Sequence, residues 1–394
     1  MKQGANDREE LLQLARDLIA IESHIEAPDL EAQAGRFLEG WFTQRGIEAR
    51  LQRVEGDRAN VIARIRGGDG PSLLLNGHLD TVPAGDMRDA FTPRMKNGTL
   101  WGRGACDMKG AIAAMACVLA SIERERAREG SFASLAGDVI FAGTVGEETG
   151  SIGVKGLVDA GVTADYAVIG EPTSLRIAIA HKGSCFVKVS LTGRSAHGSC
   201  PEEGVNAAAY AARIVGAIED ELRPRLVERT HPLLGPSTVS VGRICGGSQP
   251  NIVPETCEIE VDRRYLPGEA SPIPEIREIV AAICDGVEDL HYEVVEMPMT
   301  STVPHVPLGT PPDARLARAA AAACREARLP VEPIGVSYWS DGGHLAARGV
   351  ETIVFGPGNI ANAHGPKDHV AIDELTLAVK LYRRIVMRLL VGES

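Results

Sequence analysis

The sequence has few aromatic residues, no excess of positive charge and no long apolar run. It holds 7 Phe, 6 Tyr and 3 Trp in 394 residues, and its net charge at pH 7 is −12. Because nucleic acids and anionic membranes attract basic proteins, this charge argues against either as the main partner. No apolar stretch approaches the roughly 20 residues of a membrane helix, and residues 1–20 lack the basic start and unbroken apolar core of a secretory signal. We therefore expect a cytoplasmic protein with no membrane partner.

The eight cysteines form no CxxC pair. Scattered cysteines in a long cytosolic chain are usually buried small apolar side chains, so we expect neither a disulfide framework nor a thiolate zinc site. Cys106 precedes Asp107 in a glycine-rich loop. A reactive thiolate needs a neighbouring base or cation, and we do not expect a catalytic thiol there. The length of the chain suits two or three domains with a substantial core.

Residues 72–80, SLLLNGHLD, are the stretch around which the chain is organised. An apolar run ends at Asn76-Gly77, which is typical of a buried strand that opens into a loop. Ligands of open α/β sheets bind at that end of the strands. His78 and Asp80 then suit a metal ligand and the carboxylate that fixes its tautomer. Taken alone, they equally suit a loop histidine capped by a neighbouring aspartate.

Both ends of the chain have the pattern of an α/β sheet. Helical spacing marks 8–22, 29–45, 108–125, 312–326 and 373–391, and strand-like runs occupy 47–53, 59–66, 72–78, 331–336 and 351–356. Segments 137–151 and 165–173 are expected to be strands that end in polar loops, whereas 98–110 is expected to be a loop. Strands that alternate with helices indicate a mostly parallel sheet.

The middle of the chain has a different pattern. Strand, helix, strand, strand, helix and strand are expected at 186–196, 205–222, 237–247, 256–267, 272–287 and 291–299. This is the order of a ferredoxin-like α+β sandwich. Because a domain can be inserted at a loop of another, we predict one α/β domain built from 1–182 and 298–394, with a second domain, 183–297, inserted.

Imidazoles and carboxylates recur directly after the strand-like runs. They are His78, Asp80, Asp107, Glu147, Glu148, Glu171 and His364. Any one of them is compatible with ordinary loop polarity. Several converging on one sheet edge would bury repelling charge unless a cation lay between them. Two divalent metal ions meet that requirement, and carboxylates with two imidazoles suit zinc, with cobalt or manganese as alternatives.

The motifs GHLDTVPAG, GRGACDMKG, GEETGS, GEPT and AHGP occur in this order over most of the chain. With them the sequence resembles the di-zinc amidohydrolase and exopeptidase family, which includes acetylornithine deacetylase, succinyl-diaminopimelate desuccinylase, aminoacylase and glutamate carboxypeptidase. The resemblance implies a metallopeptidase-like catalytic domain with an inserted lid or dimerisation domain, a homodimer, and two Zn²⁺ per subunit.

The resemblance also implies roles for the site residues. His78 and Glu171 would bind one zinc, Glu148 and His364 the other; Asp107 would bridge the two, and Asp80 would hold His78. Glu147 would be the general base, which takes a proton from a zinc-activated water and passes it to the leaving amine. Two adjacent carboxylates cannot easily face one metal, which fits separate roles for Glu147 and Glu148.

The predicted inserted domain would supply further groups. The segment SAHGS at 195–199 resembles the family segment whose histidine reaches the partner subunit's site, so His197 is the expected oxyanion donor. Asn251 and Arg264 resemble binders of a substrate carboxylate, which a guanidinium matches with two parallel hydrogen bonds. Arg263 neighbours Arg264 on the opposite face of a strand, so only one of the two arginines should enter the site.

The loop SDGG at 340–343 is expected near the substrate, through Ser340 and Gly342. Glycine there permits close approach of a ligand to the backbone. Trp339 suits either a substrate pocket or a packed core, and His344 stays unassigned.

The expected activity is hydrolysis of the amide bond of an N-acyl amino acid or a similar small amide with a free carboxylate. A glutamate-carboxypeptidase-like exopeptidase or a dipeptidase is the alternative, because Asn251 and Arg264 would serve either substrate. GRGACDMKG also suggests a nucleotide-binding loop, but Gly110 rather than Ser or Thr follows Lys109. A metal-free binding protein of the same fold is a third alternative, against which the intact ligand set argues.

Overall fold

The computed structural model describes residues 2–128, 130, 132, 134–297 and 305–391. The chain divides into two compact units: unit 1 combines Met1–Ala180 with Leu308–Ser394, and unit 2 is His181–Pro307. The second predicted domain boundary, at 297/298, adjoins residues 298–304, which lie outside the described residues, as do the last two residues of the strand predicted at 291–299. Within the described part of the chain, no helix has the length and apolarity to cross a membrane.

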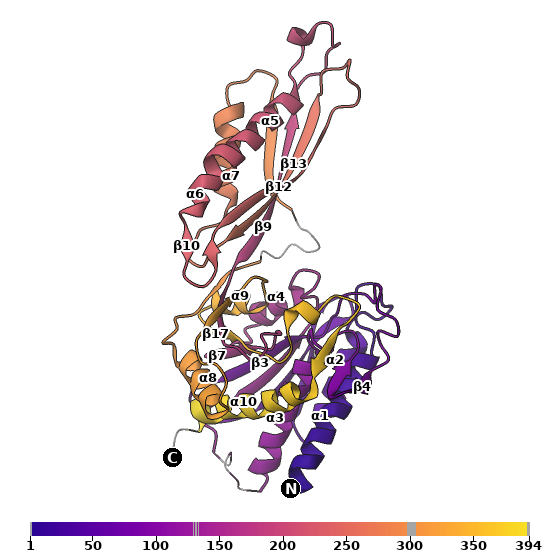
Figure 1. Cartoon of the computed structure of the whole chain (residues 1–394), viewed down its shortest axis with the longest axis vertical. Coiled ribbons are helices and arrows are strands. Elements are labelled where there is room, and N and C mark those ends of the chain that lie inside the picture. The colour runs from indigo at the N-terminus through magenta and orange to yellow at the C-terminus, as the bar shows by residue number, and fades with distance from the viewer. Residues whose placement is uncertain (1, 129, 131, 133, 298–304, 392–394) are drawn as a thin grey trace. The chain divides into compact units, whose positions relative to one another are not determined.

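A nine-stranded sheet forms the centre of unit 1 (Figure 1). Its strands are β1 (Glu48–Glu55), β2 (Arg58–Ile65), β3 (Leu73–His78), β6 (Val139–Thr144), β7 (Tyr166–Ile169), β8 (Ala178–His181), β15 (Leu308–Gly309), β16 (Ile334–Val336) and β17 (Glu351–Val354). Their order is β1-β2-β6-β3-β7-β17-β8-β15, with β16 beside β8.

The four central strands, β6, β3, β7 and β17, run parallel to one another. Nearly all of their residues are buried, as expected for parallel strands covered on both faces. The hairpin of β1 and β2 and the strand β8 add antiparallel pairs toward the edges. The predicted α/β class with a mostly parallel sheet is therefore confirmed.

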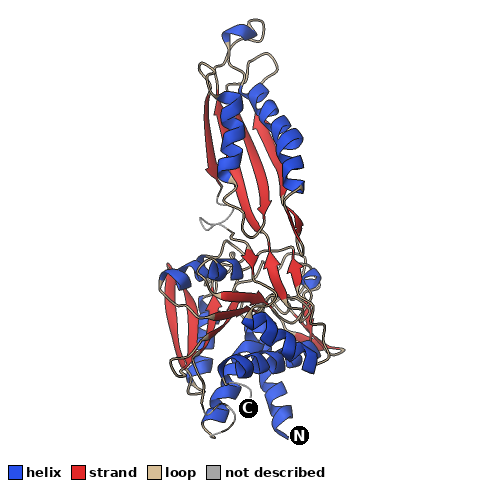
Figure 2. Ribbon diagram, turned by 90° about the vertical axis from the view of Figure 1, so that its left-hand side faces the viewer, coloured by secondary structure: helices blue, strands red, loops and turns tan. Residues whose placement is uncertain are grey.

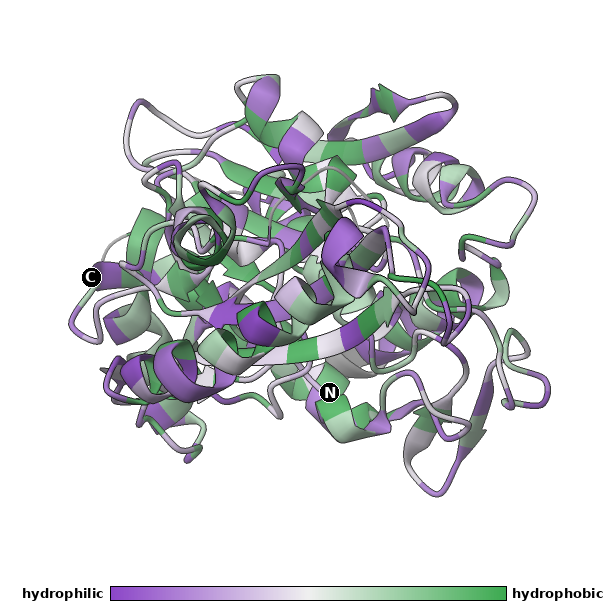
Figure 3. Ribbon diagram, turned by 90° about the horizontal axis from the view of Figure 1, so that it is seen from above, coloured by the Kyte–Doolittle hydropathy of each residue, from purple (hydrophilic) through white to green (hydrophobic). Residues whose placement is uncertain are grey.

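Helices cover this sheet. They are α1 (Lys2–Ala20), α2 (Ala32–Thr43), α3 (Lys109–Arg126), α4 (Ile152–Asp159), α8 (Arg315–Glu326), α9 (Gly342–Ala346) and α10 (Ile372–Leu390). Helix α3 packs against α1, α10 and β3. A β-carbon on Gly77 or Gly170 would lie within 2.7 Å of Met108 Cε, so these glycines let the start of α3 approach the ends of β3 and β7. In Figure 3, hydrophobic and hydrophilic residues share most helices, as amphipathic packing requires.

One prediction about local structure was wrong. Within the segment 98–110, expected to be loop, Thr99–Trp101 forms strand β5. It lies between β4 (Arg94–Lys96) and β18 (His369–Ala371) in a three-stranded sheet. A strand of three residues carries no readable period, and its partner β18 lies far along the chain. The short helices α4 and α9 were missed because eight and five residues give little periodicity.

Unit 2 has the βαββαβ order of a ferredoxin-like sandwich. It contains β9 (Gly183–Thr192), α5 (Ala207–Ala217), α6 (Arg223–Val227), β10 (Thr230–His231), β11 (Gly235–Pro236), β12 (Thr238–Gly246), β13 (Thr256–Tyr265), α7 (Ile273–Cys284) and β14 (His291–Glu296). The main sheet is antiparallel throughout, in the order β12-β13-β9-β14. Helices α5 and α7 pack on one face (Figure 2), where alternate residues such as Val189 and Ile259 are buried.

Candidate metal centre

Most of the predicted ligands in unit 1 lie at the carboxyl ends of central strands or in the loops that follow these strands. His78 ends β3, Glu147 and Glu148 follow β6, and Glu171 follows β7. Parallel pairing of β3 with both β6 and β7 brings those three loops together. The loop before α3 adds Asp107, in line with the general position of ligand sites at the carboxyl ends of such strands.

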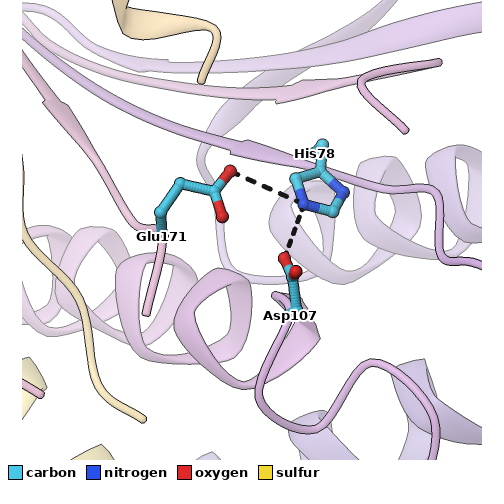
Figure 4. Close-up of side chains that lie close together, drawn as sticks. All are labelled: His78, Asp107 and Glu171. Carbon is cyan, nitrogen blue, oxygen red and sulfur yellow. Dashed lines mark hydrogen bonds and ion pairs between the residues drawn. The ribbon is translucent and has the colours of Figure 1, made fainter. Parts of the chain in front are cut away.

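The first group of candidate ligands is His78, Asp107 and Glu171 (Figure 4). His78 Nε2 lies 2.9 Å from Asp107 Oδ1 and 3.6 Å from Glu171 Oε1. All three side chains are buried. Three ligand atoms of buried side chains thus face a common point.

The second group is Asp107, Glu148 and His364. His364 Nε2 lies 2.9 Å from Glu148 Oε1 and 3.1 Å from Asp107 Oδ2. The side chain of His364 is 50% exposed, and its backbone adopts the left-handed conformation with φ 60°. Asp107 therefore offers one carboxylate oxygen to each group, which is the arrangement that two ions sharing a carboxylate require.

Asp80 contacts both the His78 ring and the backbone of the loop after β6. His78 Nδ1 is 3.0 Å from the Asp80 backbone oxygen and 3.6 Å from its carboxylate. The two carboxylate oxygens accept hydrogen bonds from the backbone N–H groups of Glu147, at 3.1 Å, and Glu148, at 2.9 Å. Asp80 therefore joins the loop after β3 to the loop after β6.

Within each group, the imidazole and the carboxylates shift one another's pKa. Burial and the neighbouring Asp107 raise the pKa of Glu171 well above its usual value, and burial also raises the pKa of Glu148. Burial lowers the pKa of His78, but the charge of Glu171 and the hydrogen bond to Asp107 outweigh this effect and raise it well above normal. Hydrogen bonds to Asp107 and Glu148 raise the pKa of His364 to about 10. The clustered carboxylates therefore favour positive charge between them.

The donor set fits divalent metal ions. Each group combines one imidazole with two carboxylates, and within each group the ligand atoms lie within 4.8 Å of one another. Nitrogen and oxygen donors of this kind suit zinc, and cobalt or manganese also accept them. Metal ions would take the place of the protons that the raised imidazole pKa values retain.

Glu147 belongs to neither group, although it is buried with 7% of its surface exposed. Burial raises its pKa well above the usual value; His78 opposes the rise, and the charges of Glu171 and Glu148 add to it. Glu147 is therefore a buried carboxylate whose pKa responds to the charges of the candidate ligands, although it belongs to neither ligand group.

Two other features of this loop region exclude alternative chemistry. The Cys106 thiol is buried among carboxylates, which raise its pKa together with burial, and it contacts the Asn359 carbonyl oxygen at 3.2 Å. It therefore lacks the properties of a nucleophile. Lys109 is buried and donates to the Ile21 carbonyl oxygen at 2.6 Å, so it does not face a phosphate site.

The remaining candidates of the predicted inserted domain lie in unit 2. His197 is exposed, and its Nδ1 lies 2.7 Å from Ser199 Oγ. The loop of Asn251 lies beside it, because the Gly198 N–H donates to the Asn251 backbone oxygen at 2.8 Å. The structure thus brings the loops of His197 and Asn251 together within unit 2.

The two adjacent arginines of β13 lie on opposite faces of the strand. Arg263 is buried, with 1% of its side chain exposed, near Glu269 and Glu275. Arg264 is 34% exposed and donates two hydrogen bonds to Asp262, from Nε at 2.8 Å and from Nη2 at 3.2 Å. Asp262 thereby fixes the orientation of the Arg264 guanidinium.

The segment SDGG at 340–343, expected to be a loop, ends in the first two residues of α9 and contains a carboxylate that was not among the predicted site residues. Ser340 is buried, and the Gly342 N–H contacts its Oγ at 3.3 Å. Between them, Asp341 is buried and accepts a hydrogen bond from Thr144 Oγ1 at 2.7 Å. Burial raises the pKa of Asp341 to about 6. As an acid beside glycines, Asp341 carries the same local signal as Glu147 and Glu148.

Comparisons with known proteins agree with this geometry. Residues 74–388 match the family model described as peptidase family M20/M25/M40. The acetylornithine deacetylase of Myxococcus xanthus is 31% identical over 376 residues, which cover 93% of this chain and 90% of that protein.

Solved structures share the fold. Aminopeptidase PepT from Bacillus cereus has a TM-score of 0.78 at 22% identity, and the match covers 98% of this chain and 99% of that one. The YXEP protein of Bacillus subtilis, described as a dinuclear metal binding peptidase from the M20 family, has a TM-score of 0.73 at 18% identity, covering 98% of this chain and 99% of that one.

The fold and the relatives define a metal-dependent hydrolase of the deacylase or peptidase kind. The chain belongs to peptidase family M20/M25/M40. The family resemblance inferred from the five ordered motifs is thereby confirmed, and the clustered side chains support two metal ions.

Proposed function

We propose that the protein hydrolyses the amide bond of an N-acyl amino acid, or of a similar small amide with a free carboxylate. The observation that carries the proposal is Asp107, whose two oxygens lie 2.9 Å from His78 Nε2 and 3.1 Å from His364 Nε2. Relatives named acetylornithine deacetylase favour a deacylase over an exopeptidase or dipeptidase.

In this proposal the five ligands hold two zinc ions, or cobalt or manganese in their place. His78 and Glu171 serve one ion, Glu148 and His364 serve the other, and Asp107 serves both. Bound ions would polarise the amide carbonyl and lower the pKa of a water molecule from about 15.7 toward roughly 7.

Glu147 is the proposed general base. Burial raises the pKa of Glu147 above its usual value, and a higher pKa makes the ionised carboxylate a stronger proton acceptor. Asp80 holds the backbone of Glu147 and Glu148 with two hydrogen bonds. Glu147 would accept a proton from the attacking water and pass it to the nitrogen of the leaving amine.

Arg264 and Asn251 are the proposed binders of the substrate carboxylate, with Ser340 and Gly342 near the substrate. A guanidinium has five N–H donors, of which Asp262 takes one from Nε and one from Nη2. The remaining donors suit a carboxylate on a small molecule.

We also propose that unit 1 is the catalytic domain, that unit 2 is the lid or dimerisation domain, and that the protein is a homodimer. Strand β12 lies at one end of the unit 2 sheet order, and most of its residues are exposed, including Ile244 at 51%. An exposed edge strand is a template for pairing with another chain. His197 would then donate a hydrogen bond to the oxyanion in the partner subunit's site.

A cytoplasmic location is part of the proposal. All eight cysteines are free thiols in the structure, and unpaired cysteines are the rule in a reducing compartment.

A substrate panel tests the proposal. N-formyl, N-acetyl, N-succinyl and N-carbamoyl amino acids, together with dipeptides, are compared by kcat/KM with and without a chelator, alongside measured metal content. We expect chelator-sensitive turnover that is fastest with an N-acyl amino acid. If dipeptides are hydrolysed faster, the protein is a peptidase rather than a deacylase. If the metal-loaded protein hydrolyses none of these amides, the proposal of an amide hydrolase is refuted.

A further inference from the structure

A buried ion pair lies next to the candidate metal centre without belonging to it. Arg103 and Asp368 are 2% and 1% exposed, and Arg103 Nη1 lies 3.3 Å from Asp368 Oδ2. Neither residue is among the predicted site residues. Burying two charges is costly unless their remaining donors and acceptors are satisfied, so their other contacts show what the pair does.

Asp368 holds the loop that leads to Asp107. Its Oδ2 accepts a hydrogen bond from the Gly104 N–H at 2.7 Å, and its Oδ1 accepts one from the Cys106 N–H at 2.9 Å. Its backbone oxygen accepts a third from the Gly102 N–H at 3.2 Å. The backbone up to the residue before Asp107 therefore depends on one aspartate from the far end of the chain.

Arg103 reaches two other loops. Its Nε and Nη2 donate to the carbonyl oxygens of Pro83, at 3.1 Å, and Ala84, at 3.0 Å, in the loop after His78. Its Nη1 donates to the carbonyl oxygen of Gly365 at 3.1 Å, directly after His364. Because the His364 side chain is half exposed, packing fixes it weakly, and its backbone anchor matters more.

We propose that Arg103 and Asp368 are a positioning pair, which sets the backbone of the loops carrying His78, Asp107 and His364 at the spacing two metal ions need. The inference rests on the proposed metal centre. Both side chains are buried, so neither is expected to contact the substrate directly. The planar guanidinium fork serves several carbonyl groups at once, and the ammonium group of lysine cannot reproduce it.

Metal titration of the full chain tests this inference. Metal-free wild type and the variants Arg103→Lys and Asp368→Asn are titrated with Zn²⁺ against a chromophoric chelator. Outer contacts of metal ligands typically contribute about 10- to 100-fold in affinity. We expect a loss of that size for at least one of the two ions in each variant. Arg263→Lys is the matched control, because Arg263 is an equally buried arginine, 1% exposed, in unit 2; it should leave both affinities unchanged.

Each outcome decides the matter. If a folded Arg103→Lys or Asp368→Asn protein binds both Zn²⁺ ions as tightly as wild type, the positioning role is wrong, but the proposed metal centre is unaffected. The same holds if Arg263→Lys loses as much Zn²⁺ affinity as these variants. If both conservative variants fail to fold, the pair is a folding element and the inference is wrong. Wild-type protein that binds fewer than two ions would overturn the proposed centre as well, whereas two bound ions without amide hydrolysis would overturn only the proposed function.

Discussion

Replacing Glu147 by glutamine separates the roles of two adjacent acids. Glu148 Oε1 lies 2.9 Å from His364 Nε2, whereas Glu147 is buried outside both ligand groups. Glu147→Gln should therefore keep both metal ions and lose turnover. Glu148→Gln is the matched comparison, made one residue along the same loop, and it should lose one ion.

The size of the effect follows from the role of a general base. Such a group contributes roughly 10²- to 10⁴-fold to the rate, which is about 3–5 kcal/mol at 1.36 kcal/mol for each factor of ten. We expect kcat to fall by that factor in Glu147→Gln. KM should change little, because the amide side chain keeps the volume of the acid.

The stability of the metal-free protein gives an independent readout. Burial raises the pKa of Glu147 in the folded state, so the stability contributed by its protonated form is complete below pH 4.5 and is lost as the pH rises through the folded pKa. At pH 7 the metal-free wild type has lost part of this stability, whereas a glutamine at position 147 stays neutral and loses none. Metal-free Glu147→Gln should therefore unfold at a higher temperature than metal-free wild type.

Three measurements settle the prediction: kcat on the best amide of the panel, metal content by atomic emission, and the thermal midpoint of the metal-free proteins at pH 7. Glu147→Gln that lost a metal ion would make Glu147 a ligand. Unchanged kcat with full metal content would refute its role as the base.

Three further predictions concern residues of unit 2, which are Arg264, His197 and His181. Arg264→Ala should raise KM about 10- to 100-fold for substrates with a free carboxylate, as loss of hydrogen bonds to a charged group predicts; an equal effect on carboxamide analogues would contradict the assignment. His197→Ala should lower kcat by roughly 10²- to 10³-fold without changing the unfolding midpoint, and an unchanged kcat would remove His197 from the site. Burial lowers the pKa of His181 to about 4, so its stabilising contribution is complete above pH 6.5 and is lost toward pH 4. Between pH 7 and pH 5, urea unfolding of wild type should lose about 2 kcal/mol more than that of His181→Gln; equal losses would refute the burial argument.

Much of the candidate site was predictable because its ligands follow buried strands. The apolar run Leu73–Leu75 predicts β3, and His78 is the last residue of that strand. Glu147 and Glu171 lie three and two residues beyond the ends of β6 and β7. Since parallel strands bring their carboxyl ends to one edge, local patterns alone indicated which side chains would meet.

Other parts of the region depend on contacts that local patterns do not contain. Asp341 accepts its hydrogen bond from Thr144, which is 197 positions away, and Arg103 pairs with Asp368 across 265 positions. The sequence around each aspartate, SDGG for Asp341 and GPKD for Asp368, contains the acid but gives no indication of its partner. Such pairs become visible only when the fold places distant segments together.

Asp80 lies beside His78, as the sequence predicts, but it also makes contacts that the sequence does not indicate. The sequence suggests that its carboxylate orients His78, yet the ring nitrogen lies closer to the Asp80 backbone oxygen than to the carboxylate. The carboxylate also accepts hydrogen bonds from the N–H groups of Glu147 and Glu148. One short side chain thus fixes the distance between a candidate ligand on β3 and the proposed base and second ligand after β6. Because two adjacent glutamates must point in different directions to act separately, holding their backbone is as necessary as orienting the imidazole.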